Sequence, residues 1–248
     1  AAPQEVGARK TMKVLMVSAN TSRTPYPVYP LGMSMVAAAV SRAGHEVACF
    51  DFLQSGLSLD ALGKAVRDAE PEVVGVSIRN IDNVNLLNEQ RYIDVVRDVV
   101  ERVKRESRAK VVLGGSAFSI LPERILAAVG GDYGIVGEGE ARFVAFLDEA
   151  SEGRYPPLGV IFRNGEWMPG EAIPSAEYDG PMLSHYLKSG SVASVQTKRG
   201  CPLSCVYCSY PALEGRAIRP RDPARVVDDI EELVGKHGAR FLFFTDSL

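Results

Sequence analysis

The residues most able to do chemistry form a short cysteine cluster, because three of the four cysteines lie within eight residues, at Cys201, Cys205 and Cys208. Three thiolates on one loop can converge on one metal centre. A structural zinc site needs a fourth ligand, but Cys49 is far upstream, and neither His185 nor His237 has a ligand-like spacing to the thiols. A cubane iron–sulfur cluster normally takes four cysteines, so three leave one iron open to a substrate or cofactor. The residues favour an open cluster over zinc or unpaired thiols.

The elements that must position this loop begin with a short apolar strand at residues 192–195. Upstream, strands and helices alternate. The predicted strands are 14–17, 46–52, 72–78, 110–113 and 133–136, and the predicted helices are 31–43, 59–69 with Ser58 as N-cap, 86–107, 121–129 and 140–150. This order predicts an α/β fold with an open, flavodoxin-like, doubly wound parallel sheet.

Ligands of such sheets bind at the carboxyl ends of the strands. There the chain carries a long loop, 20–32, and a polar loop, 79–83, followed by the glycine-bearing segments 114–116 and 137–140. Glycine lets a ligand approach the backbone closely. A dinucleotide fingerprint and a P-loop are both absent from the sequence. Taken alone, these glycines are also compatible with an empty structural domain in which they only make turns.

The Cys-x3-Cys-x2-Cys spacing, with Tyr207 before the last cysteine and a strand before the loop, resembles the signature of radical S-adenosylmethionine (SAM) enzymes. The resemblance implies a 4Fe–4S cluster on the three cysteines, with SAM bound to the fourth iron and cleaved to a 5′-deoxyadenosyl radical. It places Tyr207 near the adenine. Asp246, at the end of a later strand, falls where these enzymes carry a residue that helps to hold SAM.

The upstream domain resembles the cobalamin-binding domain of one radical SAM subclass. The likeness rests on Pro-Leu-Gly in the first loop, Gly-Gly after the fourth strand and Gly-Glu-Gly-Glu after the fifth. It implies a B12-binding, Rossmann-like domain followed by the start of a radical SAM (β/α) partial TIM barrel. The cobalamin contacts that it implies are Asn20, Pro30, Gly32, Ser77, Arg79, Asn80, Ile81, Asp82, Gly114, Gly115, Ser116, Gly137, Glu138 and Gly139.

The Asp-x-His-x-x-Gly motif that supplies an axial histidine in the wider B12-binding fold is absent. His45, at a helix-to-strand turn, is interpreted as a solvated turn residue. Arg79 cannot lose its proton to become a ligand, and Asn80 could at most hydrogen-bond an axial water. We therefore expect cobalamin bound base-off and His-off, with water or nothing below the cobalt. An Arg79–Asp82 pair in a solvated loop is the alternative.

The function implied is methylation of an unactivated carbon through methylcobalamin, with a second SAM supplying the radical. Ring formation or rearrangement without methyl transfer stays open. A methylthiotransferase would use three further cysteines upstream, where only Cys49 stands. A zinc- or cobalamin-binding sensor is the non-enzymatic alternative. No catalytic residue is identified beyond the cluster ligands. The expected partners are a small-molecule, lipid or peptide substrate and an electron donor such as flavodoxin or ferredoxin.

Composition sets the remaining expectations. A net charge of −3 gives no electrostatic reason to expect nucleic acid, no apolar run reaches the length of a membrane span, and the clustered cysteines favour a reducing cytoplasm. Residues 1–11 are expected to be a cloning remnant or disordered tail and 12–153 the cobalamin-binding domain. Residues 154–190 are expected to be a linker with a hairpin turning at Asn164 and Gly165. Residues 191–248 are expected to begin the radical SAM domain, with a helix capped by Asp222 and a buried parallel strand at 240–248; one βα unit and a strand do not close a barrel, so a longer protein is expected.

Overall fold

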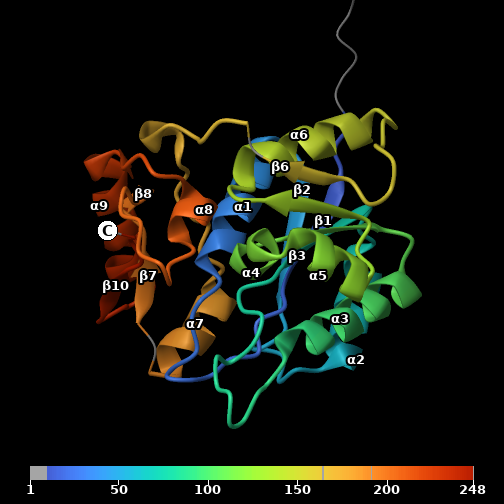
Figure 1. Ribbon diagram of the computed structural model, residues 1–248, viewed down its shortest axis with the longest axis horizontal. Coiled ribbons are helices and arrows are strands. Elements are labelled where there is room, and N and C mark those ends of the chain that lie inside the picture. Colours follow the sequence, from blue (N-terminus) through green and yellow to red (C-terminus); the bar gives the residue numbers. More distant parts are fainter. Residues whose placement is uncertain (1–9, 164, 191, 248) are drawn as a thin grey trace, which may run out of the picture.

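A six-stranded parallel sheet organises the upstream part of the molecule (Figure 1). The computed structural model describes residues 10–163, 165–190 and 192–247. The strand order is β2-β1-β3-β4-β5-β6, and every neighbouring pair is parallel. The strands are β1 (Lys13–Ser18), β2 (Glu46–Asp51), β3 (Val73–Ser77), β4 (Lys110–Gly114), β5 (Tyr133–Val136) and β6 (Ile161–Arg163). The predicted doubly wound fold is thereby confirmed.

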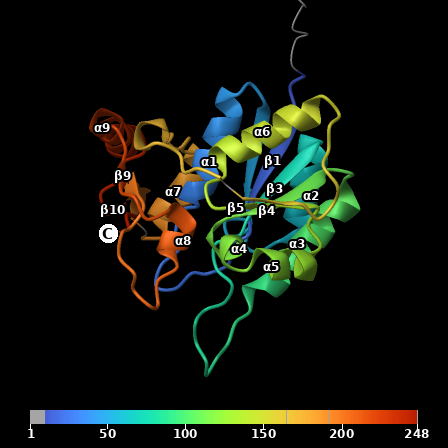
Figure 2. The same cartoon turned by 45° about the horizontal axis from the view of Figure 1, so that its top comes forward.

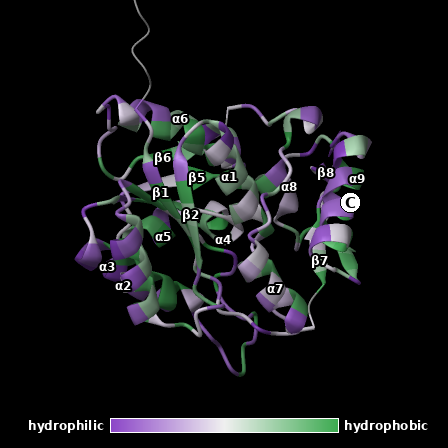
Figure 3. Ribbon diagram, turned by 180° about the vertical axis from the view of Figure 1, so that it is seen from behind, coloured by the Kyte–Doolittle hydropathy of each residue, from purple (hydrophilic) through white to green (hydrophobic). Residues whose placement is uncertain are grey.

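Helices cover both faces of the sheet. Helices α1 (Leu31–Arg42) and α6 (Glu140–Ser151) pack together on one face. On the other lie α2 (Leu59–Ala69), α3 (Tyr92–Glu106) and α5 (Pro122–Val129). Figure 3 shows many hydrophilic residues along α2 and α3. The Ser58 hydroxyl caps α2 as expected, accepting a hydrogen bond from the Ala61 N–H at 3.1 Å. The short α4 (Ser116–Ile120), which was not predicted, lies at the end of β4.

The alternation of side chains along β1 divides the core in two. Val14 and Met16 point into the cluster beneath α1 and α6, whereas Leu15 and Val17 point into the cluster beneath α2, α3 and α5. Both faces of a central parallel strand are therefore buried, and this explains why these strands read as continuous apolar runs in the sequence.

Helix α3 begins at Tyr92, and the predicted start at Leu86 is wrong. Residues 82–91 form a loop that projects from the body of the molecule (Figure 2). Its polar side chains fix turns: the Asn83 amide oxygen accepts N–H bonds from Asn85 and Gln90, at 3.3 and 3.0 Å. Short amide side chains that bond to neighbouring backbone compete with helix formation, so Leu86 and Leu87 are left fully exposed.

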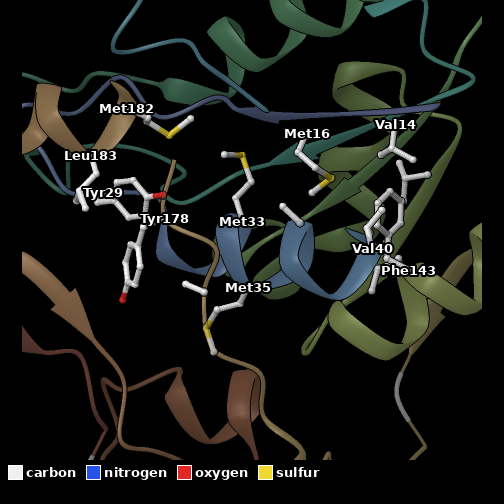
Figure 4. Close-up of a cluster of buried hydrophobic side chains, with 14 of the residues drawn as sticks. Val14, Met16, Tyr29, Met33, Met35, Val40, Phe143, Tyr178, Met182 and Leu183 are labelled. Atoms are coloured by element: carbon white, nitrogen blue, oxygen red, sulfur yellow. The ribbon is translucent and has the colours of Figure 1, made fainter. Parts of the chain in front are cut away.

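The linker region contains more structure than predicted. The prediction of a hairpin in this region is wrong, because β6 pairs in parallel with β5 as the sixth strand of the sheet. Asn164, at the predicted turn, lies outside the described residues. A 3-10 turn, η1 (Gly170–Ala172), precedes α7 (Gly180–Lys188). Figure 4 shows Tyr178, Met182 and Leu183 of this region in one apolar cluster with Met16 of β1 and Met33 of α1. The linker is thus packed onto the core of the upstream domain.

The downstream part begins with β7 (Ala193–Val195), as expected, and pairs it in parallel with β10 (Leu242–Phe244). Between them lie β8 (Lys198–Arg199), α8 (Tyr210–Glu214), β9 (Arg219–Pro220), α9 (Pro223–Glu231) and a π-helical turn, η2 (Glu232–Lys236). Asp222 caps α9, as predicted, through the Ala224 N–H at 3.0 Å. The prediction that β10 is buried is wrong. Phe243 and Phe244 are 51% and 49% exposed, so no described element covers them fully.

Candidate cofactor-binding site

A cavity of about 520 Å³ opens at the carboxyl ends of the strands. The ends of β1, β3, β4 and β5 and the first turns of α1 and α6 form one wall. Twelve of the predicted contacts line it: Asn20, Pro30, Gly32, Ser77, Arg79, Asn80, Gly114, Gly115, Ser116, Gly137, Glu138 and Gly139. Their shared location follows from the fold, because strand ends of a parallel sheet meet at one edge; their contact with cobalamin stays a prediction.

Two predicted contacts, Ile81 and Asp82, do not line the cavity. Ile81 packs against the core cluster beneath α2, α3 and α5. The Asp82 carboxylate accepts a hydrogen bond from the Val84 N–H at 2.6 Å, and its backbone forms an isolated bridge with Arg91. The chain therefore turns away from the cavity after Asn80, and the assignment of these two residues to the site is corrected. Arg79 and Asp82, both within the described residues, form no ion pair. The alternative prediction, in which these two residues pair in a solvated loop, is therefore wrong.

Two glycines shape the wall in different ways. Gly115 has φ +96° and ψ 174°, a conformation that is essentially restricted to glycine, and a Cβ there would lie 2.5 Å from the carbonyl oxygen of Ile78. Gly32 is different, since a Cβ there would meet no protein atom within 4 Å. Gly115 is thus required by the fold, whereas Gly32 leaves open space that a ligand can fill.

The cavity also offers polar groups to a ligand. Asn20 is buried, and its Oδ1 accepts the Ser22 N–H at 3.2 Å. Its Nδ2 has no hydrogen-bond partner within the described part of the chain, and buried donors are seldom left unpaired. A ligand rich in amide oxygens satisfies such a donor. With the space at Gly32, this fits cobalamin, whose corrin ring carries several primary amides.

The opposite wall comes from the downstream part of the chain and was missed from the sequence. Its residues share positions at the ends of β7, β8 and β10 or on α8: Gln196, Arg199, Ser209, Tyr210, Leu213, Glu214 and Thr245. Ser209 directly follows Cys208. The cavity is therefore bounded on one side by the glycine-bearing strand ends and on the other by the segment that contains the cysteines.

A buried ion-pair cluster joins the two walls. Arg199 lies 3.1 Å from Glu138 and 2.6 Å from Glu140, and Arg219 lies 2.8 Å from Glu138. Burial alone would raise the pKa of Glu140, but Arg199 outweighs it and lowers that pKa; burial opposes the charge of Arg199, and its two carboxylate partners raise its pKa. Glu140 and Arg199 therefore form a charged pair. Of the four residues of this cluster, the sequence analysis predicted only Glu138 as a site residue. The position of Arg199, two residues before Cys201, was the one signal in the sequence that could have pointed to it.

The cysteine loop holds its thiols in different surroundings. Cys201 is buried, and its N–H donates to the Gly215 carbonyl at 3.1 Å, whereas Cys205 is exposed and Cys208 is intermediate. Among the described residues, no three His, Cys, Asp or Glu side chains converge as a metal site. The donor set itself, three thiols on one eight-residue loop, fits a cluster that leaves one iron open.

The two residues expected near SAM lie outside the cavity lining. Tyr207 is 87% exposed, and the neighbouring Cys205 raises its pKa. The Asp246 carboxylate is engaged by the N–H and hydroxyl of Thr197. Their roles toward SAM stay predictions.

None of the three histidines lines the cavity. The interpretation of His45 as a solvated turn residue is wrong. The ring is buried, its Nδ1 accepts the Met12 N–H at 3.2 Å, and its Nε2 lies 3.3 Å from Asp148. His45 therefore joins the start of β1 to α6, at the end of the sheet away from the cavity.

Comparison with known proteins places this geometry in a family. The family of the B12 binding domain matches residues 17–147, which include the end of β1, all of β2 to β5 and the loops that follow these strands at the cavity. The chain belongs to the B12-binding domain family. Within the described residues, no helix is long and apolar enough to cross a membrane.

Relatives extend the likeness to the downstream segment. The chain is 23% identical to tryptophan 2-C-methyltransferase of Streptomyces laurentii, over 92% of this chain and 48% of that protein. It is 26% identical to the anaerobic magnesium-protoporphyrin IX monomethyl ester cyclase of Cereibacter sphaeroides, over 88% of this chain and 37% of the relative.

A solved structure superposes on nearly the whole chain. The radical SAM methyltransferase TsrM of Kitasatospora setae, determined with cobalamin and a [4Fe-4S] cluster bound, superposes with a TM-score of 0.80 at 26% identity, over 96% of this chain and 48% of TsrM. The chain spans about half the length of TsrM and of the tryptophan methyltransferase, and a smaller share of the cyclase.

Proposed function

We propose that this chain provides the cobalamin- and cluster-binding portion of a radical SAM enzyme that methylates an unactivated carbon. One observation carries the proposal: a single cavity is lined by the strand ends of a B12-binding domain and by residues that flank a three-cysteine loop. A cofactor in that cavity lies beside whatever the thiols hold. Two cofactors that must act on one substrate need this proximity.

The residues have separable tasks in this proposal. Cys201, Cys205 and Cys208 hold the cluster through thiolates, while Asn20 and the open space at Gly32 receive cobalamin. When bound, the cluster supplies the electron that cleaves SAM, and cobalamin supplies the methyl group.

The wall also has apolar residues, Met16, Val36, Ile135 and Phe143. Their side chains exclude water from the cavity, which protects reactive species from side reactions. The buried carboxylates of Glu138 and Glu140 are paired with arginines of the protein, which offsets their negative charge at the cavity.

The relatives support methyl transfer, since two of those described act as methyltransferases by their names. The cyclase supports a second candidate, ring formation on the same scaffold. SAM with an isotopically labelled methyl group separates the two: label in the product indicates methylation, and an unlabelled cyclised product indicates cyclisation. A small-molecule, lipid or peptide substrate and a flavodoxin or ferredoxin as electron donor complete the proposal.

Anaerobic reconstitution with iron and sulfide tests the cluster. We expect about four irons per chain and reductive cleavage of SAM, both lost in Cys201→Ala, Cys205→Ala and Cys208→Ala. Cys49→Ala is the matched control, because burial raises the pKa of Cys49 to about 12 and keeps it a thiol. A Cys201→Ala protein that still cleaves SAM would refute the assignment. Binding of one zinc in place of iron would instead support the sensor.

A further inference from the structure

The buried ion-pair cluster links the cobalamin wall to the cysteine loop across a long stretch of sequence. Glu138 and Glu140 follow β5, and Arg199 stands 61 and 59 residues later. Arg199 is two residues before Cys201. Its guanidinium bonds both carboxylates, and its Nε donates to the Gln196 side chain at 2.9 Å. A planar guanidinium with several donors can hold three acceptors at once, which a lysine ammonium does less well.

One end of this link is open toward the cavity. Glu140 uses one carboxylate oxygen to bond Arg199, while its Oε2 is buried without a hydrogen-bond partner among the described residues. Glu140 lines the cavity together with Glu138 and Arg199. A buried acceptor without a partner carries a desolvation cost, and an amide N–H of a bound ligand would remove it. The carboxylate thus has one side for a ligand and one for Arg199.

From this geometry we propose that Arg199 is a positioning residue that makes the order of the cysteine loop depend on cobalamin in the cavity. A ligand against Gly137, Glu138 and Glu140 restrains the two carboxylates, they restrain Arg199, and the backbone carries the restraint to Cys201. The thiols are then organised when cobalamin is present. The inference rests on the proposed function, in which the cavity takes cobalamin and the loop takes the cluster.

Removal of Arg199 alone would confuse this role with misfolding, because it leaves two buried carboxylates with one arginine. The double variant Arg199→Met/Glu140→Gln removes one charge of each sign and keeps the Arg219–Glu138 pair. Arg221→Met/Asp229→Asn is the matched control. It removes another buried pair, 2.8 Å apart, in which Arg221 reaches the Gln196 carbonyl but neither cavity carboxylate.

The test measures the alkylation rate of each cysteine in iron-free, anaerobic protein, by iodoacetamide and peptide mass spectrometry. The rate is compared with and without saturating methylcobalamin in the dark, and binding is followed by absorbance. Cys201 is the reporter because it is buried, and exposed Cys205 is the internal reference. In the unsubstituted protein we expect methylcobalamin to slow alkylation of Cys201 about fivefold or more, the size of a typical coupling between sites, with little change at Cys205.

The double variant should bind methylcobalamin at a higher concentration and show no protection of Cys201. The single variant Arg199→Lys should keep part of the protection of Cys201. The control Arg221→Met/Asp229→Asn should keep all of it. Undiminished protection in the double variant, or binding without protection in the unsubstituted protein, would overturn the inference alone. Failure of the unsubstituted protein to bind methylcobalamin would overturn the proposed function as well.

Discussion

The carboxylate of Asp246 accepts two hydrogen bonds from Thr197, one from the backbone N–H at 2.7 Å and one from the hydroxyl at 2.5 Å. The Lys198 N–H lies 3.3 Å from the same carboxylate. Asp246, two residues after the end of β10, therefore fixes the segment between β7 and β8 that leads to the cysteines. A carboxylate proposed to hold SAM already has a local structural task.

Substitution can separate the two tasks. If Asp246 also bonds the SAM amine, Asp246→Ala should weaken SAM binding about tenfold or more, the value of a lost charge-assisted hydrogen bond. Iron content should be unchanged. Thr197→Val removes only the hydroxyl bond and should bind SAM nearly as the unsubstituted protein does. Titration of the reconstituted protein with SAM measures both, and equal losses in the two variants would leave Asp246 with the local task alone.

Gly115 should be essential for stability. Its φ of +96° and the 2.5 Å approach of a Cβ to the Ile78 carbonyl oxygen both oppose a side chain. We expect Gly115→Ala to lower the free energy of unfolding by about 2 kcal/mol or more, since such a conformation costs 1–3 kcal/mol in other residues. Urea denaturation followed by circular dichroism measures the change. A loss below about 0.5 kcal/mol would show that the loop after β4 relaxes freely.

Gly32→Ala is the complementary variant. A Cβ at this position meets no protein atom within 4 Å but faces the cavity. The free energy of unfolding should stay the same or rise by up to about 1 kcal/mol, because alanine favours the helix in which residue 32 lies. Cobalamin binding should weaken measurably in absorbance titrations. Unchanged affinity would mean that cobalamin does not approach α1 at this residue.

The sequence predicts the parallel sheet and its ligand edge because those signals are local. Each buried strand is a short apolar run, and glycines mark where β4 and β5 end. The predicted start of α3 is wrong for a local reason too. Leu86 and Leu87 favour a helix in the sequence, but the side chains of Asn83 and Asn85 hydrogen-bond to nearby backbone N–H groups and hold the segment in turns.

The second wall could not be predicted, because it depends on contacts between distant segments. Arg199 meets Glu140 across 59 residues, and nothing near either residue in sequence specifies the other. The same holds for His45, whose ring partner Asp148 is 103 residues away. Burial of a polar side chain by a distant element leaves no local periodicity to detect.

The buried pair of Asp51 and Tyr186 should make stability depend on pH. The Tyr186 hydroxyl donates to Asp51 at 2.6 Å. Burial raises the pKa of Asp51, and the bond from Tyr186 opposes that rise. An acid whose pKa is raised on folding binds more protons folded than unfolded, so its contribution to stability falls as pH rises from its unfolded pKa, near 3.8, through its folded pKa.

Tyr186→Phe should raise the pKa of Asp51 further and enlarge that loss. We expect the free energy of unfolding to fall by about 1.5–3 kcal/mol at pH 8, where the lost bond is to a charged group, and by less at pH 4.5. Urea denaturation at the two pH values measures the difference. When Tyr186→Phe is introduced into Asp51→Asn, the loss of free energy of unfolding that it causes should be the same at both pH values. Equal losses at both pH values in Tyr186→Phe would mean that Asp51 keeps one protonation state throughout.

The lower face of cobalamin is the last feature open to test. The Arg79 backbone is held by the Ser116 hydroxyl, which donates to its carbonyl at 2.8 Å, and Arg79 and Asn80 both line the cavity. Asp82, which could have drawn Arg79 away, bonds the Val84 N–H instead. His45, His185 and His237 are all absent from the lining.

We therefore expect cobalamin bound base-off and His-off, because an arginine that stays protonated cannot donate a lone pair to cobalt. Electron paramagnetic resonance of the Co(II) form should show no nitrogen superhyperfine splitting from an axial ligand. Arg79→His places an imidazole at the same position and should introduce that splitting, which makes it a positive control. Splitting in the unsubstituted protein that persists in Arg79→Ala and Asn80→Ala would show that cobalamin lies in this cavity with a different face toward the loop after β3.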